Sequence, residues 1–182
     1  MPLAQYSLGL ALLTENRRSE ALAALDKAIE LDAGNGEAYR TRGLAYVMDG
    51  QFDKAVDDLR AASTIDSDNY KAIIELGMNF GIAARDQQAA RLFEIAAESA
   101  PTVALPQYLY GHFLINHRAF ERGLSYVDRA LAIDPLQAEH HVGRGFGLLG
   151  QGRIEEAVAA YRRAGELDPG SAGIAGTLLF AL

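Results

Sequence analysis

The chain is 182 residues long, and its 49% hydrophobic and 23% charged residues are typical of a folded protein rather than a disordered one. Its 17 Lys and Arg residues are outnumbered by 24 Asp and Glu, and the formal net charge of −7 argues against nonspecific binding to a nucleic-acid backbone. The chain has no Cys, which excludes disulfides, a thiolate nucleophile and Cys-ligated metal sites.

The N-terminal segment carries no signal for export or membrane insertion. Its first residues, MPLAQYSLGLALLTEN, lack a basic leading stretch. No part of the chain approaches the run of about 20 apolar residues that crosses a bilayer. We therefore expect a soluble, cytoplasmic protein that binds neither membranes nor nucleic acid.

A period of 34 residues organises the chain into five blocks, without an insertion or deletion: 2–35, 36–69, 70–103, 104–137 and 138–171. Three positions of the block carry a small residue every time. The eighth holds Gly9, Gly43, Gly77, Gly111 and Gly145; the twentieth holds Ala21, Ala55, Ala89, Gly123 and Ala157; the twenty-seventh holds Ala28, Ala62, Ala96, Ala130 and Ala164. Glycine costs a helix about 0.8–1 kcal/mol relative to Ala, so its recurrence predicts two helices that pack closely in every block.

In chain order, the pattern predicts a first helix over about the second to fourteenth positions of each block and a second helix over about the eighteenth to thirtieth. Asn16, Gly50 and Gly152 suit the left-handed turn between the two helices in three blocks. Pro101, Pro135 and Pro169 are expected to stop second helices. Four residues lie where they could cap the helix that follows: Asn35, Asn69, Thr102 and Ser171.

These residues resemble the tetratricopeptide repeat family, whose 34-residue pattern is met well by AYRTRGLAYVMDGQFDKAVDDLRAASTID and HHVGRGFGLLGQGRIEEAVAAYRRAGELDP. The family's usual aromatic at the fourth position is present only as Tyr39. The resemblance covers residues 2–171 and implies an all-α, right-handed superhelical solenoid of five helix-turn-helix repeats. We expect residues 1–182 to form a single domain that ends in a helix over 172–182.

The last eleven residues, AGIAGTLLFAL, fit the first helix of a sixth block that covers the fifth pair of helices. Because this helix has no polar residue after Thr177, we expect the natural chain to continue beyond Leu182. The segment AGTLLFAL is similar to the end of the repeat region in bacterial relatives of the O-linked N-acetylglucosamine transferases. That similarity implies an alternative function, the substrate-recruiting arm of a larger enzyme such as a glycosyltransferase. The Asn ladder of those enzymes is absent from the sixth positions, which hold Ser7, Thr41, Glu75, Leu109, Gly143 and Thr177.

The family resemblance places the second, fifth, ninth, twelfth and thirteenth positions on the inner, concave wall of the superhelix. The fifth, ninth and twelfth positions are largely apolar here, which favours a protein-interaction scaffold that binds a peptide or an amphipathic helix on this wall. Arg40 and Tyr108 would supply polar groups at the rim. The predicted partner-binding residues are Leu10, Arg40, Leu44, Met78, Tyr108, His112 and Phe146. The alternative interpretation is that much of the stripe is half-buried between neighbouring first helices.

Other chemistries have weaker support in the sequence. Of the basic and amide residues with which family members clamp acidic chaperone C-termini, only Lys71 is present. The segment GFGLLG matches a dinucleotide-binding motif but follows a helical pattern instead of a strand. The four His residues have no metal-ligand spacing. We therefore expect no enzymatic activity, no catalytic or metal site and no cofactor. The expected partner is a protein or peptide, with self-association through the apolar terminal segments as a further prediction.

Overall fold

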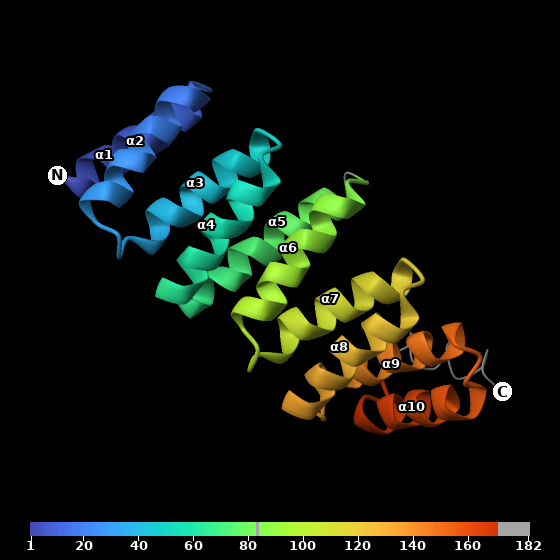
Figure 1. The fold of residues 1–182 in the computed structure, drawn as a ribbon. Helices are drawn as coiled ribbons and strands as arrows, with labels where there is room; N and C mark the ends of the chain where they lie inside the picture. The colour runs from blue at the N-terminus through green and yellow to red at the C-terminus, as the bar shows by residue number, and fades with distance from the viewer. Residues whose placement is uncertain (83, 171–182) are drawn as a thin grey trace. The chain divides into compact units, whose positions relative to one another are not determined.

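The computed structural model describes residues 1–82 and 84–170. Within these ranges the chain forms ten α-helices, one short 3-10 helix and no strand (Figure 1). The predicted terminal helix over 172–182 and the predicted cap Ser171 lie outside the described residues. The elements are α1 (Pro2–Thr14), α2 (Arg18–Leu31), α3 (Gly36–Met48), α4 (Phe52–Ile65), η1 (Ser67–Asn69), α5 (Tyr70–Ile82), α6 (Asp86–Ser99), α7 (Ala104–Asn116), α8 (Phe120–Ile133), α9 (Ala138–Gly150) and α10 (Ile154–Leu167).

The helices repeat in one register. Each first helix occupies the first to thirteenth positions of its block, and each second helix the seventeenth to thirtieth, so every helix begins one residue earlier than predicted. The two helices of each pair lie side by side in Figure 1. The predicted all-α class of helix-turn-helix repeats is therefore confirmed.

The contacts of the chain divide it into two compact units, Met1–Ala100 and Pro101–Leu182. The first unit contains α1 to α6 with η1, and the second contains α7 to α10. The boundary falls three residues before the end of the third predicted block. That residues 1–182 form a single domain stays a prediction.

The turn between the helices of a pair is the same in all five blocks. Its fifteenth position has a positive φ each time, at Asn16, Gly50, Ala84, Arg118 and Gly152. The next backbone N–H donates to the carbonyl oxygen five residues earlier, as from Arg17 to Leu12 at 2.9 Å and from Arg153 to Leu148 at 3.0 Å. This is the Schellman pattern of helix ends. It holds Ala84 and Arg118 in a conformation that neither side chain favours, which the sequence did not indicate.

The predicted helix boundaries are partly confirmed. The Asn35 side chain accepts a hydrogen bond from the Ala38 N–H at 3.0 Å, as an N-cap should. The prediction for Thr102 is wrong, because Val103 is the N-cap of α7 and makes no side-chain cap bond. The Asn69 side-chain amide donates to the Ala62 carbonyl at 2.9 Å and so secures the end of α4. The helices before Pro101, Pro135 and Pro169 end two residues ahead of each proline.

The recurring glycines are where the helices of a pair meet. A Cβ at Gly9 would lie 2.7 Å from Leu25 Cγ, and one at Gly145 would lie 2.4 Å from Tyr161 Cε1. At Gly111 it would lie 2.7 Å from the carbonyl oxygen of Gly123. These separations leave no room for a methyl group. The predicted role of the eighth position, close helix packing, is confirmed.

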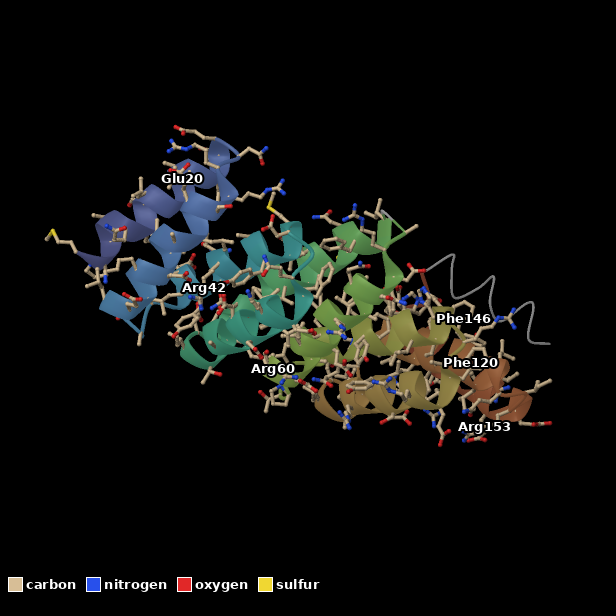
Figure 2. The ribbon with its side chains drawn as sticks, turned by 45° about the horizontal axis from the view of Figure 1, so that its top comes forward. Glu20, Arg42, Arg60, Phe120, Phe146 and Arg153 are labelled. Carbon is tan, nitrogen blue, oxygen red and sulfur yellow. The ribbon has the colours of Figure 1, made fainter. Side chains whose placement is uncertain are left out.

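Behind the glycine contact, the seventh position of the first helix faces the twenty-third of the second. In the second block this pair is Arg42, which Figure 2 labels, and Asp58. Two hydrogen bonds of 2.7 and 2.6 Å join them, and Asp58 is only 5% exposed. In the fourth block it is Tyr110 and Tyr126, whose ring centroids lie 4.6 Å apart. One structural position thus holds an ion pair in one block and an aromatic pair in another.

The same seventh position also links successive blocks. Arg42 Nη1 on α3 donates to Asp26 Oδ1 on α2 at 2.7 Å. In the second unit, Arg144 Nε on α9 donates to Asp128 Oδ1 on α8 at 2.8 Å, with the same separation of 16 residues. Within each unit, therefore, one arginine joins a first helix to the second helix of the preceding block.

Candidate partner-binding surface

The second, ninth and thirteenth positions of the first helices share one face, because they are four or seven residues apart. This first-helix face is exposed and largely apolar in both units. Seven of the exposed large hydrophobic side chains occupy it: Leu3 (69%), Leu10 (39%), Met48 (61%), Met78 (50%) and Ile82 (85%) in the first unit, and Leu105 (49%) and Phe146 (44%) in the second. Solvated helix faces usually carry charged residues, so this distribution makes the face a candidate contact surface.

The predicted partner-binding residues fall into three groups. Leu10, Met78 and Phe146 are exposed, and Figure 2 labels Phe146 in the second unit. Arg40, Leu44 and His112 are half-buried. Tyr108 is only 5% exposed, so its predicted place at the rim is wrong. That the exposed residues bind a partner stays a prediction.

Neighbouring positions on the first helices are mostly buried. Val47 and Ile115 at the twelfth position are 2% and 5% exposed, and Ile74 at the fifth is 6% exposed. For these positions the alternative interpretation, burial between helices, is correct. Leu149 departs from this pattern, because it is 37% exposed at the twelfth position of α9.

The predicted partner-binding residues do not include Met48 and Ile82, at the thirteenth positions, or Leu3 and Leu105, at the second. Both positions belong to the wall that the family resemblance implies, and the 34-residue register assigns these residues to it. Reading the contents of those two positions as well as the fifth, ninth and twelfth would therefore have found them.

The charges of the first-helix face in the first unit are mostly paired. Lys71 Nζ lies 3.0 Å from Asp68 Oδ2, and this hydrogen bond raises the pKa of Lys71. The Arg40 guanidinium donates to the Glu37 carboxylate. Glu75, which lies on α5 between Lys71 and Met78, is exposed and makes no hydrogen bond or ion pair with a residue that the structure describes. It is a free carboxylate beside the apolar side chains.

In the second unit, aromatic rings gather where α7 meets α9. The Tyr108 ring centroid lies 5.7 Å from that of His112 and 4.7 Å from that of His140. Burial raises the pKa of Tyr108, and the neighbouring Glu139 carboxylate raises it further. Burial also lowers the pKa of His112 and of His140, although Glu139 partly opposes this. Both imidazoles are therefore mainly neutral at pH 7.

Two polar hollows lie on the second helices of the first unit, between α4 and α6. One, of about 320 Å³, is lined by Arg60, Ser63, Thr64, Glu98 and Ser99. The other, of about 200 Å³, is lined by Gly50, Phe52, Asp53, Gln87, Gln88 and Arg91. Ion pairs bridge both: Arg60 to Glu98 at 2.5 Å and Arg91 to Asp53 at 2.6 Å. They contribute nothing to the apolar first-helix face.

The motif-like segments have structural roles. Gly145 to Gly150 lies inside α9, so the GFGLLG segment is not a strand-to-helix phosphate loop. The Asp66 side chain accepts from the Asp68 N–H and caps the turn of η1. In residues 1–82 and 84–170, no helix is long and apolar enough to cross a membrane, and no three metal-ligating side chains come together.

Comparison with curated proteins finds similarity to part of a longer chain. The protein is 27% identical over 120 residues to anaphase-promoting complex subunit 3 of Schizosaccharomyces pombe, an alignment that covers 66% of this chain and 18% of that protein. The chain spans between 14% and 23% of the length of the curated relatives it matches.

Solved structures show the same fold. YrrB, described as a TPR protein with an unusual peptide-binding site, matches with a TM-score of 0.60 and 21% identity over 97% of this chain and 91% of YrrB. The first TPR domain of Spaghetti (RPAP3), bound to the HSP90 peptide SRMEEVD, matches with a TM-score of 0.60 and 18% identity over 64% of this chain and 92% of that domain. A family model described as tetratricopeptide repeat matches residues 6–70 and 111–172. Together with ten helices in a 34-residue register, this match shows that the chain belongs to the tetratricopeptide repeat family.

Proposed function

We propose that the chain is a protein-interaction module that binds a peptide or an amphipathic helix of another protein on its first-helix face. The observation that carries this proposal is the recurrence of exposed apolar side chains at the same block positions, among them Met78 and Phe146. The peptide-binding site named for YrrB and the bound peptide of Spaghetti support the same kind of function.

The ligand we propose differs from the acidic peptide SRMEEVD of the Spaghetti structure. Of the residues that clamp acidic C-termini in the family, this chain has only Lys71. Its ammonium group already forms an ion pair with Asp68, with Nζ and Oδ2 3.0 Å apart. An acidic peptide would also meet the free carboxylate of Glu75 on the same face. Repulsion between like charges therefore opposes that ligand class.

Substituting Met78 and Phe146 together by Glu should abolish partner capture, because two charges would replace apolar contact area at 50% and 44% exposed positions. Capture from source lysate followed by titration of the captured protein measures the effect, and the affinity should fall at least about tenfold. A matched control is Ile65→Glu with Ile154→Glu, since these residues are 44% and 53% exposed but lie on second helices. Unchanged binding by the Met78/Phe146 variant, with its helical circular dichroism intact, would reject this surface.

A second candidate function keeps the same surface but places it in a larger enzyme, as a substrate-recruiting arm, most directly of a glycosyltransferase. The similarity of AGTLLFAL that suggests it lies outside the described residues. The sixth positions would not supply an Asn ladder, because they hold Ser7, Thr41, Glu75, Leu109 and Gly143. Sequence beyond Leu182 that encodes a nucleotide-sugar-binding α/β domain would support this function, and its absence from the complete gene would reject it.

We also propose that α1 provides a self-association surface. This helix has no charged residue from Pro2 to Thr14, and Ala4, Ser7 and Ala11 are exposed. The equivalent residues of α3 are Ala38, Thr41 and Ala45, which are 0%, 7% and 1% exposed. Ala38 belongs to a cluster with Ala28 and Ile29 of α2. The exposed face of α1 therefore matches one that α3 buries against a helix.

The partner we propose for this face is α1 of a second copy. The other candidate partner, the last described helix α10, is less suitable. It carries Arg162 at the twenty-fifth block position, where α2 has the Asp26 that pairs with Arg42 of α3. Because α1 has no carboxylate, it could not pair with Arg162. Two uncharged α1 helices leave no buried charge. Ser7→Arg should therefore shift a concentration-dependent dimer to monomer in light scattering after size exclusion, whereas Ser125→Arg, at an exposed position of α8, should not. A monomeric wild-type chain would contradict this proposal.

A further inference from the structure

We infer that the first-helix face of the first unit takes a basic amphipathic helix: a segment of another protein in which apolar residues recur at helical spacing and Lys or Arg lies beside them. This inference rests on the proposed function and specifies the ligand of that site. In addition to the apolar contacts, we assign the Glu75 carboxylate a role in recognising Lys or Arg of the ligand.

The exposed apolar side chains of this face lie on α3 and α5. Leu44 and Met48 lie four residues apart on α3, and Met78 and Ile82 lie four apart on α5, so each pair forms one ridge. Met48, Met78 and Ile82 are 61%, 50% and 85% exposed. Ridges of this kind accept the apolar stripe of a helical ligand, and unbranched Met side chains adapt to its shape.

Glu75 supplies a negative charge beside these apolar side chains. It lies three residues before Met78 and seven before Ile82, so its carboxylate is on the same face of α5. The neighbouring charges are already engaged, Lys71 by Asp68 at 3.0 Å and Arg40 by Glu37. Glu75 has no such partner among the described residues, so its carboxylate is available to pair with a cation of the ligand.

The surrounding charge acts in the same direction. Residues 1–100 contain 10 Lys and Arg against 16 Asp and Glu, so this unit carries most of the chain's net charge of −7. A negative field of this kind draws cationic ligands toward the surface and lowers the association rate of anionic ones. The long-range field and the free carboxylate therefore both select a basic ligand.

The test uses two synthetic helical peptides of about 16 residues, roughly four turns, labelled with a fluorophore. Both have Leu at i, i+3, i+4 and i+7 spacing, and their polar faces carry Lys and Ala in one and Glu and Ala in the other. Fluorescence anisotropy at about 0.15 M salt, where the Debye length is about 8 Å, measures their affinity for the full chain. The Lys peptide should bind at least about tenfold more tightly than the Glu peptide.

Three variants locate the effect. Glu75→Lys should weaken the Lys peptide about three- to tenfold. Asp57→Lys makes the same change in net charge at another exposed carboxylate that pairs with no described residue, but it lies on α4, so its effect should stay within about twofold. Met78→Gln should weaken both peptides about fivefold, because it removes apolar contact without adding charge.

The outcomes separate this inference from the proposed function. Equal binding of the two peptides, with loss in Met78→Gln, would overturn the basic ligand and keep the site. Equal losses in Glu75→Lys and Asp57→Lys would overturn the local role of Glu75. Binding that Met78→Gln leaves unchanged would overturn the site itself, and with it the proposed function. No saturable binding of the Lys peptide would overturn the inference outright.

Discussion

Replacing Gly111 by Ala is expected to lower the free energy of unfolding by about 2–3 kcal/mol, even though Ala favours a helix by about 1 kcal/mol. The new Cβ would lie 2.7 Å from the Gly123 carbonyl oxygen and 2.9 Å from the Val127 amide nitrogen. Both are backbone atoms, so relief requires α7 and α8 to move apart. Urea unfolding followed by circular dichroism measures the loss.

The matched control is Gly81→Ala in α5. A Cβ there would have no atom within 4 Å, and the residue is helical with no positive φ. This variant should gain up to about 1 kcal/mol from helix propensity alone. The two substitutions are chemically identical, so opposite changes in the free energy of unfolding would be due to the close approach of α7 and α8. A Gly111→Ala variant as stable as Gly81→Ala would show that these helices are not in backbone contact.

Replacing Arg42 by Leu should be the most destabilising polar substitution, at about 3 kcal/mol. It would leave the Asp58 carboxylate, whose side chain is 7% exposed, without its two hydrogen bonds from the guanidinium. The cost of leaving the Asp58 carboxylate buried and unpaired exceeds what the part-buried Arg42 to Asp26 bond contributes. Denaturant titration of the single variant measures this cost.

The double variant Arg42→Leu with Asp58→Leu should recover most of the lost stability. The third block has Leu76 and Leu92 at these two positions, and Leu92 is 3% exposed. The fold therefore already accommodates an apolar pair there, and no buried charge remains. If the double variant were less stable than Arg42→Leu alone, Asp58 would need another source of stabilisation than its arginine.

The sequence predicted the parts of the fold that depend on recurring residue types. Gly9, Gly43, Gly77, Gly111 and Gly145 identified the helix contact, since a Cβ at each of them would lie no more than 3.2 Å from an atom of the paired helix. The pairs at the seventh and twenty-third positions were not predicted, since what recurs there is a contact and not a residue. The ion pair of Arg42 with Asp58 and the aromatic pair of Tyr110 with Tyr126 occupy equivalent positions. A comparison of residue types between blocks does not detect this equivalence.

The candidate surface was predicted less completely, for two physical reasons. The exposure of a wall residue depends on the helix beside it, and Tyr108 is buried because Gly143 of α9 makes room for its ring. A Cβ at Gly143 would lie 2.8 Å from Tyr108 Cε2. The sequence could not predict that the Glu75 carboxylate is free either. Whether Lys71 pairs with Glu75 or with Asp68 depends on how η1 leads into α5.

The arginine links between successive blocks constrain how such a chain can grow by duplication. Arg42 pairs with the aspartate of the preceding second helix, and the residue at that position within its own block is Arg60. A tandem copy of the second block would therefore set two guanidinium groups against each other. The first and fourth blocks end in helices with Asp26 and Asp128 at this position, so a block bearing such an arginine can follow them. A rearrangement that placed Arg42 after Arg60 would therefore lose this ion pair, whereas one that placed it after Asp128 would keep it.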